Sequence, residues 1–274
     1  MITAKKAIAA GMAGASLLWA TQALAVPHDW GTDFQAAASP VMANIEEFHR
    51  LLLYIIVAIS LFVLVLLLWV AVRYNQRANP TPSKTHHNTL LEVAWTFLPV
   101  LILGIIAVPS FRLLYFEAVI PQPDVTIKAI GKQWSWSYEY PGAKFTFDSL
   151  PLKDADAAKA GEPRLLGVDN AVVVPVNKVI EVETTGADVI HSWALPEMGV
   201  KMDAVPGRIN HTWFKADRMG TFYGECSELC GANHDFMPIE VKVVSAADFA
   251  AWVASAKKKF ASLDQGATTQ LASR

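Results

Sequence analysis

The sequence is poor in charge and in cysteine, and it lacks any glycine-rich phosphate-binding motif. Charged residues make up 18 % of the 274 residues and hydrophobic residues 53 %, a balance that is typical of a membrane protein and excludes a highly charged disordered chain. We find no internal repeat and no nucleotide-binding glycine motif, so nothing predicts a repeat architecture or a nucleotide or nucleic-acid ligand. With only two cysteines, the chain can form at most one internal disulfide.

Residues 1–25 have the pattern of a secretory signal. Lys5 and Lys6 precede an apolar run over residues 7–18, and Ala23-Leu24-Ala25 resembles a cleavage site. We expect cleavage after Ala25. An uncleaved first membrane helix is the alternative, but the run is short and rich in glycine and alanine. Export would place the mature N-terminus outside the cytoplasm, where thiols tend to become oxidised.

Two apolar runs predict a two-helix membrane anchor within residues 26–117. Residues 51–72 contain no charge, and 22 residues at about 1.5 Å each span a hydrocarbon core of roughly 30 Å. The second run covers residues 93–111, and its Pro99 and Gly104 are tolerable in a membrane helix whose neighbours satisfy the freed backbone groups.

The loop between these runs predicts the topology. Residues 73–92 carry Arg73, Arg77 and Lys84 against the single acid Glu92, and short positive loops stay cytoplasmic. Both termini are therefore expected outside the cytoplasm, in agreement with the signal sequence.

From about residue 118 to residue 244 the pattern changes to short alternating strands separated by Gly, Pro and Asn. Examples are residues 125–129, 180–184 and 239–243, in which apolar and polar side chains alternate. This patterning predicts an all-β sandwich or barrel. Residues 245–274 are expected to form an amphipathic helix capped by Ser245 and then, from Asp264, a loose tail.

The most informative segment holds both cysteines, a histidine and a methionine within twelve residues: Cys226, Cys230, His234 and Met237. Thiolate and thioether are soft donors, and together with imidazole they favour copper over calcium, magnesium or manganese. A copper site needs a further nitrogen donor, for which His191 is the best candidate, because it follows a strand-like segment over residues 187–190 and precedes a proline-bounded loop. Two alternatives stay open from the residues alone. One is a Cys226–Cys230 disulfide, and the other is a four-coordinate Cys2His2 zinc site, which gives no role to Met237.

Four long segments carry a specific resemblance. They are residues 131–140 (GKQWSWSYEY), 191–193 (HSW), 203–208 (DAVPGR) and 226–238 (CSELCGANHDFMP). In this order, behind a two-span anchor, they resemble subunit II of the haem–copper cytochrome c oxidases of the bacterial type. The resemblance covers nearly the whole mature chain. It implies that the β domain is a cupredoxin-like sandwich that carries a binuclear copper A centre.

The resemblance also implies the ligand set of that centre. In the family, the cysteines at the positions of Cys226 and Cys230 bridge both coppers, and the histidines at the positions of His191 and His234 bind one copper each. The thioether of Met237 and the backbone carbonyl of Glu228 complete the set. A mononuclear blue-copper site uses one cysteine, so the second cysteine is what the resemblance links to a binuclear site.

Further roles are implied residue by residue. The Glu228 side chain matches a ligand of a magnesium or manganese ion at the boundary with subunit I, and a carboxylate oxygen suits such a hard ion. Asp203 and Arg208 match positions near that boundary. Trp134 matches the tryptophan through which electrons arrive from cytochrome c; without the resemblance it would be interpreted as a core aromatic.

Glu92 has two interpretations. Its position alone favours a solvated carboxylate at the membrane edge, whereas the resemblance favours the mouth of a proton-uptake path.

The expected partner surface is acidic. Residues 118–244 hold 17 acidic and 12 basic side chains, a net charge of −5 that would steer a basic partner such as cytochrome c. The acids at or near the family's docking positions are Glu139, Asp148, Asp169 and Asp188. Two departures, Ser135 in place of a usual tyrosine and Ala187 in place of a common acid, affect the detail of docking.

The resemblance thus implies a subunit of a proton-pumping cytochrome c oxidase that accepts electrons from cytochrome c and passes them to haem in subunit I, where oxygen is reduced to water. Subunit I, and with it subunit III, is the expected partner, and this chain alone should have no turnover. A quinol oxidase subunit of the same fold would lack the thiolate and imidazole ligands. A copper chaperone or mononuclear copper protein gives no role to Trp134 or Glu228, and a nitrous oxide reductase needs a large additional domain.

Overall fold

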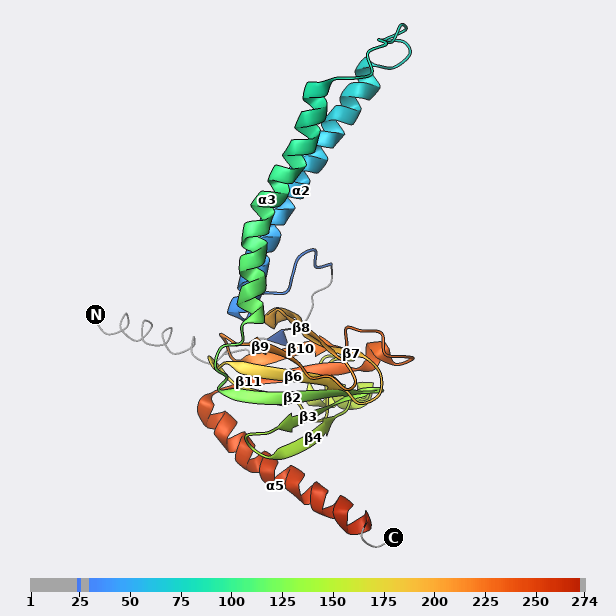
Figure 1. The fold of residues 1–274 in the computed structure, drawn as a ribbon. Coiled ribbons are helices and arrows are strands. Elements are labelled where there is room, and N and C mark those ends of the chain that lie inside the picture. Colours follow the sequence, from blue (N-terminus) through green and yellow to red (C-terminus); the bar gives the residue numbers. More distant parts are fainter. Residues whose placement is uncertain (1–23, 26–29, 272–274) are drawn as a thin grey trace, which may run out of the picture.

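A computed structural model describes residues 24–25 and 30–271, with side chains from residue 30 to residue 260. Figure 1 shows two parts, a long helical hairpin and a β domain at its foot, with helix α5 running along the far side of the domain. The predicted signal sequence lies outside the described residues apart from Leu24 and Ala25.

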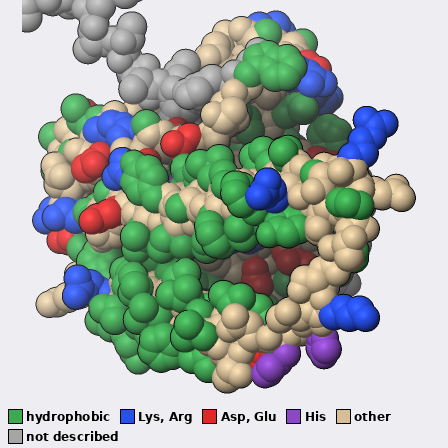
Figure 2. Space-filling model, turned by 90° about the horizontal axis from the view of Figure 1, so that it is seen from above, with side chains coloured by type: hydrophobic (Ala, Val, Ile, Leu, Met, Phe, Trp, Pro, Cys, Tyr) green, Lys and Arg blue, Asp and Glu red, His purple; other side chains and the backbone are tan. Residues whose placement is uncertain are grey.

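The hairpin consists of α2 (Pro40–Arg73) and α3 (Thr89–Ala118). Both helices begin at a side-chain cap: Ser39 Oγ accepts from the N–H of Met42, and Asn88 Oδ1 accepts from the N–H of Leu91. Each contains one of the predicted spans, and both are long and apolar enough to cross a membrane, with mean hydropathies of 3.3 and 2.3 over an 18-residue stretch of each. Viewed along the hairpin, hydrophobic side chains gather in broad patches on the surface (Figure 2).

The β domain is built from two sheets and a separate hairpin. One sheet has the order β1-β10-β11-β5, made of β1 (Leu24–Ala25), β10 (Gly220–Glu225), β11 (Pro238–Val244) and β5 (Val172–Pro175). The other has the order β4-β3-β2-β6-β9, made of β4 (Phe145–Ser149), β3 (Ser135–Tyr140), β2 (Val125–Lys132), β6 (Ile180–Gly186) and β9 (Asn210–Phe214). Strands β7 (His191–Leu195) and β8 (Val200–Ala204) pair with each other. The predicted all-β sandwich is confirmed.

The expected alternation of buried and more exposed side chains is confirmed in β6 but is wrong in β11, where Glu240 is buried between Ile239 and Val241. Along β6 the burial alternates strictly, with Ile180, Val182 and Thr184 inside. The two sheets enclose a core rich in large aromatic side chains, which include Trp136, Tyr138, Tyr140, Trp193, Phe214 and Phe222. Aromatic rings of this size bury much apolar surface per residue, which gives the domain a rigid frame.

The foot of the hairpin is tied to the β domain by main-chain hydrogen bonds. Ala38 donates to the carbonyl of Glu197 at 2.8 Å, and Asp217 donates to the carbonyl of Ala38 at 3.0 Å. Ser39 Oγ also donates to the carbonyl of Met198 at 2.7 Å. At the other helix, Trp213 Nε1 donates to the carbonyl of Glu117 at 3.1 Å. These bonds fix how the domain sits on its anchor.

Short helices and a long terminal helix complete the fold. They are α4 (Asp154–Ala160), the 3-10 turns η1 (Pro196–Met198) and η2 (His234–Phe236), and α5 (Ala246–Leu271). The predicted Ser245 cap is confirmed, because Ser245 Oγ accepts from the N–H of Asp248 at 3.1 Å. The loose tail expected from Asp264 is wrong up to Leu271, since the helix continues through a stretch without proline.

Candidate metal centre

The predicted ligand loop runs between β10 and β11, and the antiparallel pairing of these strands closes it. The N–H of Cys226 donates to the carbonyl of Met237 at 3.1 Å, which joins the two ends of the loop. Trp193 on β7 forms an isolated bridge with Cys226, and Ser227 donates to the carbonyl of Ser192 at 2.9 Å. Residues 35 positions apart along the chain are therefore brought side by side.

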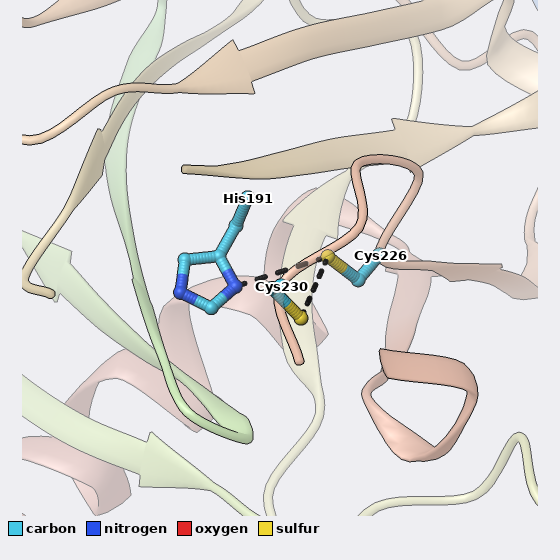
Figure 3. Close-up of side chains that lie close together, drawn as sticks. All are labelled: His191, Cys226 and Cys230. Atoms are coloured by element: carbon cyan, nitrogen blue, oxygen red, sulfur yellow. Dashed lines mark hydrogen bonds between the residues drawn. The ribbon is translucent and has the colours of Figure 1, made fainter. Parts of the chain in front are cut away.

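This pairing delivers His191 to the loop. His191 opens strand β7, whereas the sequence predicted that a strand over residues 187–190 would precede it; that segment lies outside the strand. Figure 3 shows the His191 ring directed at the two cysteine side chains. His191 Nδ1 lies 3.8 Å from Cys226 Sγ, and the two sulfur atoms lie 3.9 Å apart.

His234 lies next to the second cysteine of the pair. Its Nδ1 lies 3.6 Å from Cys230 Sγ, so each cysteine sulfur faces one imidazole nitrogen. The backbone carbonyl of Glu228 lies 3.4 Å from Cys226 Sγ. Met237 is fully buried in the core next to the loop. Four of the predicted donors thus form a two-by-two arrangement of sulfur and nitrogen, with a carbonyl oxygen beside it.

Both cysteines are buried and free in this structure. A sulfur–sulfur separation of 3.9 Å is far longer than the roughly 2.05 Å of a disulfide bond, so the thiols are available as ligands. Burial raises the pKa of the Cys226 thiol, but hydrogen bonds from His191 and from nearby backbone outweigh it and lower that pKa to about 6. Burial and the neighbouring Cys226 sulfur raise the pKa of Cys230, so Cys226 is the first to become a thiolate.

Asp188 holds the His191 ring in place. His191 Nε2 lies 2.9 Å from Asp188 Oδ1, and this leaves Nδ1 to face the sulfur. Burial alone would lower the pKa of His191, but Cys226 and Asp188 raise it. For Asp188, burial raises the pKa, whereas the bonds from His191 and from two backbone N–H groups lower it further. A carboxylate behind a ligating histidine fixes the ring orientation and increases its basicity.

The donor set fits a soft metal. Two thiols and two imidazole nitrogens converge, and His191, Cys226 and Cys230 have donor atoms that all lie within 4.8 Å of one another. Thiolate and imidazole together suit copper and zinc rather than calcium or magnesium.

Trp134, predicted to receive electrons, lies beside the centre and not far out on the surface. It is partly buried against the domain core. A Cβ atom added to Gly231, the residue after Cys230, would lie 3.1 Å from Cζ2 of the Trp134 ring.

Asp203, Arg208 and the Glu228 side chain are exposed. Asp203 and Arg208 line one shallow surface pocket of about 430 Å³ together with Lys201 and Asn210. Asp203 also pairs with Ser192 across the β7–β8 hairpin, one residue from His191. Asp203 and Arg208 therefore lie on a surface next to strand β7, which carries His191.

The four predicted docking acids have different surroundings. Glu139 pairs with Lys128 at 3.4 Å and Asp148 with Lys132 at 3.1 Å, while Asp169 accepts from the N–H of Leu150 at 2.7 Å. Asp188 keeps 37 % of its side chain exposed although it holds His191.

Glu92 belongs to a separate place, on the first turn of α3 at the end of the hairpin far from the β domain (Figure 1). His87 Nδ1 lies 2.8 Å from its Oε1. The structure does not bring Glu92 near the candidate metal centre.

Sequence reasoning missed two residues of the centre. Gln133 Nε2 donates to the carbonyl of Cys230 at 2.8 Å, although it lies 97 positions away. A Cβ atom on Gly131 would lie 2.6 Å from Cδ2 of His191, so only glycine fits there. Nothing in the sequence pattern signals either contact. The Gln133 contact depends on the packing of the β2–β3 turn onto the loop, and the Gly131 contact depends on the packing of β2 against β7.

Comparison with known proteins gives consistent relationships. Residues 125–244 match the family described as cytochrome C oxidase subunit II, periplasmic domain, and residues 27–113 match its transmembrane domain. The probable cytochrome c oxidase subunit 2 of Rickettsia bellii is 50 % identical over 233 residues, which cover 85 % of this chain and 86 % of the relative. Cytochrome c oxidase subunit 2 of Cereibacter sphaeroides is 42 % identical over 272 residues, which cover 93 % of this chain and 90 % of the relative.

A solved structure also aligns. The periplasmic domain of subunit II of cytochrome oxidase (CoxB) of Bradyrhizobium japonicum is 62 % identical and covers 52 % of this chain and 99 % of that one, with a TM-score of 0.49.

The two family matches cover the anchor and the β domain in the order that the structure has them. The relatives are alike over most of their own length, so the relationship concerns the whole protein and not a single domain. The chain is a membrane protein and a subunit of an oxidoreductase: it belongs to the cytochrome c oxidase subunit II family.

Proposed function

We propose that this chain accepts single electrons from cytochrome c at a binuclear copper A centre and passes them to haem in subunit I, where oxygen is reduced to water. One observation carries the proposal. Cys226 and Cys230 lie side by side, and each faces the Nδ1 atom of one histidine, at 3.8 Å for His191 and 3.6 Å for His234. A mononuclear blue-copper site uses only one cysteine, and a Cys2His2 zinc site gives no role to Met237.

The metal would be held by the two thiolates, the two imidazoles, the Met237 thioether and the Glu228 carbonyl. When bound, copper A supplies reversible one-electron transfer, with the unpaired electron shared by two metals so that bond lengths change little. The chain's own residues would keep the metal ligands in fixed positions. The ligand loop connects two paired strands, and Asp188 fixes the orientation of the His191 ring.

The route inward would begin at Trp134. A Cβ atom on Gly231 would lie 3.1 Å from the Trp134 ring, so the side chain is in van der Waals reach of the ligand loop, and it is only partly buried. Glu139, Asp148, Asp169 and Asp188 would attract a basic cytochrome c, and the net charge of −5 on residues 118–244 favours such an encounter at low salt.

The route outward would cross the boundary with subunit I. Asp203 and Arg208 share a surface pocket, and the exposed Glu228 carboxylate would bind a shared magnesium or manganese ion. The haems would belong to the partner subunit, and subunit III would complete the assembly. Glu92, at the far end of α3, would mark the mouth of a proton-uptake path.

This function requires the β domain on the outer face of a bacterial inner membrane. The positive loop between the spans favours that orientation, as does the predicted signal sequence over residues 1–25, to be removed after Ala25. The mature protein would comprise the anchor over residues 26–117, the copper A domain over 118–244 and the terminal segment over 245–274.

Metal analysis tests the proposal directly. The full-length chain, purified in detergent and loaded with copper, should hold two coppers, and its EPR spectrum should show one unpaired electron shared equally between them. One bound zinc, or an internal disulfide without copper uptake, would contradict the proposal.

A kinetic experiment tests the direction of transfer. Reduced cytochrome c should be oxidised by the copper-loaded chain at a rate that falls as salt rises. Trp134→Leu should slow this step without changing the copper content. A rate that does not respond to salt would remove the predicted role of the acids.

A further inference from the structure

The turn between β2 and β3 contacts both sides of the ligand set. Lys132 pairs with Ser135, so Gln133 and Trp134 form a two-residue connection. Such connections favour Gly, Asn or Asp, and neither residue is one of these. The geometry of the turn therefore does not explain why these two residue types are present. Their contacts with other parts of the domain give the explanation.

Gln133 makes two of these contacts. Its side-chain Nε2 donates to the carbonyl of Cys230 at 2.8 Å, and its backbone N–H donates to Asp188 Oδ2 at 2.7 Å. Cys230 is a predicted bridging ligand, and Asp188 holds the predicted ligand His191. A single residue is thus bonded to the cysteine side and to the histidine side of the centre.

Asp188 is held in one orientation. Its Oδ1 accepts from the N–H of Val189 at 2.7 Å and lies 2.9 Å from His191 Nε2, while Oδ2 is occupied by Gln133. The carboxylate therefore cannot rotate without breaking a bond to one of its neighbours, and His191 keeps Nδ1 toward Cys226.

Gly231 allows the same turn to lie close over the loop. A Cβ at this position would lie 3.0 Å from Gln133 Nε2 and 3.1 Å from Trp134 Cζ2, and the φ angle of +127° is one that side-chain-bearing residues rarely adopt. Trp134 Nε1 is buried and has no hydrogen-bond partner among the described residues. The indole is therefore held by packing alone, and the Gln133 bonds are what anchor the turn.

We propose that Gln133 is a positioning residue of the copper centre. It joins the carbonyl of Cys230 to the Asp188–His191 pair and holds Trp134 against the ligand loop. This inference rests on the proposed copper A function and deepens it. Partners of this kind, one step removed from the ligands, typically contribute about 10- to 100-fold to metal affinity.

Two variants test the proposal in the full-length chain loaded with copper. Gln133→Leu removes the donor, and Gln133→Glu keeps the shape but faces the Cys230 carbonyl with an acceptor. Each should release copper to a chelator about 10-fold faster than the unmodified chain. Each should also change the copper hyperfine pattern of the EPR spectrum, because the Cys230 sulfur is no longer fixed.

Asn170→Leu is the matched control. Asn170 Nδ2 also donates to a backbone carbonyl, that of Asp148, at 3.0 Å, but it touches no predicted ligand. The metal-free melting temperature should fall by a similar small amount in Asn170→Leu and Gln133→Leu, whereas only the Gln133 variants should change copper release and the EPR spectrum.

The outcomes are distinguishable. Wild-type copper release and an unchanged spectrum in a folded Gln133 variant would overturn the positioning role and leave the copper A function standing. If Gln133→Leu does not fold, the near-isosteric Gln133→Glu decides by the same two readouts. If the unmodified chain does not hold two coppers, both proposals are overturned.

Discussion

In the membrane hairpin the large hydrophobic side chains face outward, whereas in the β domain they face inward. No side chain of α3 is buried, and in α2 only Val41 and Met42 are, both at the end that meets the domain. The domain instead encloses residues such as Trp136, Trp193 and Phe214. The outward-facing side chains of the hairpin therefore need an apolar environment such as lipid, while the domain carries its own core.

The two parts also differ in how they make contacts. The helices satisfy their backbone within a few residues, but the candidate metal centre joins residues that are 35, 55 and 97 positions apart. A substitution in the domain should therefore disturb a metal ligand that lies far away along the chain, whereas a substitution in a span should disturb only neighbouring residues of the same helix. Four predictions test this difference, from the largest expected effect to the smallest.

Cys230→Ser should abolish the binuclear site. The hydroxyl is a poor substitute for a bridging thiolate, so the expected copper content falls below two per chain and the shared-electron EPR signal disappears. Met237→Leu is the matched comparison. It replaces the thioether with an apolar side chain of similar volume, so both metals should stay bound while their reduction potential shifts. Two shared coppers in Cys230→Ser would contradict the assignment.

Gly131→Ala should disturb His191 from another strand. The added Cβ would lie 2.6 Å from the imidazole, which is fully buried and held by Asp188, so the ring cannot simply move away. Overpacking of this kind costs about 1–3 kcal/mol of unfolding free energy. The melting temperature and copper content should both fall. Gly142→Ala, with nothing within 4 Å of the new Cβ, is the control, and an equal effect there would refute the steric argument.

Glu197→Gln should change the pH dependence at the junction of the two parts. Burial raises the pKa of this carboxyl to about 7 from 4.5, although Arg218 lowers it. Between these values the folded protein keeps a proton that the unfolded chain has released, so stability falls as pH rises through this window, by about 3 kcal/mol.

In Glu197→Gln that pH-dependent loss should vanish, and the variant should melt higher than the unmodified chain at pH 8 but not at pH 4. Glu225→Gln, an exposed carboxyl, makes the same change of charge and serves as the control. Equal melting curves for Glu197→Gln and the unmodified chain at both pH values would show that Glu197 does not govern the junction.

Ser39→Ala should loosen the foot of the hairpin by the smallest amount. It removes the cap on Met42 and the 2.7 Å bond to the carbonyl of Met198, at an expected cost of about 1 kcal/mol. Ser60→Ala lies on the exposed surface of the same helix and should melt like the unmodified chain. Thermal unfolding in detergent compares the two, and an equally unaffected Ser39→Ala would mean that the junction does not depend on this side chain.

Much of the architecture could be predicted because its signals are local. A charge-free run specifies a span, alternation specifies β6, and a cap motif specifies the start of α5, as the structure confirms. The predicted strand before His191 and the loose tail after Asp264 were wrong, since element boundaries depend on pairing and on helix continuation more than on pattern.

By itself the sequence determined that the chain has a two-span anchor, a β domain and a loop with two thiols, an imidazole and a thioether. Each of these features can be recognised from a short run of consecutive residues. Only the tertiary structure decided that His191 faces Cys226, that Asp188 stands behind it, and that Gln133 bonds to the Cys230 carbonyl. The physical reason is that these contacts exist only after β2, β7 and β10 have packed together, and no local pattern encodes the distance between strands.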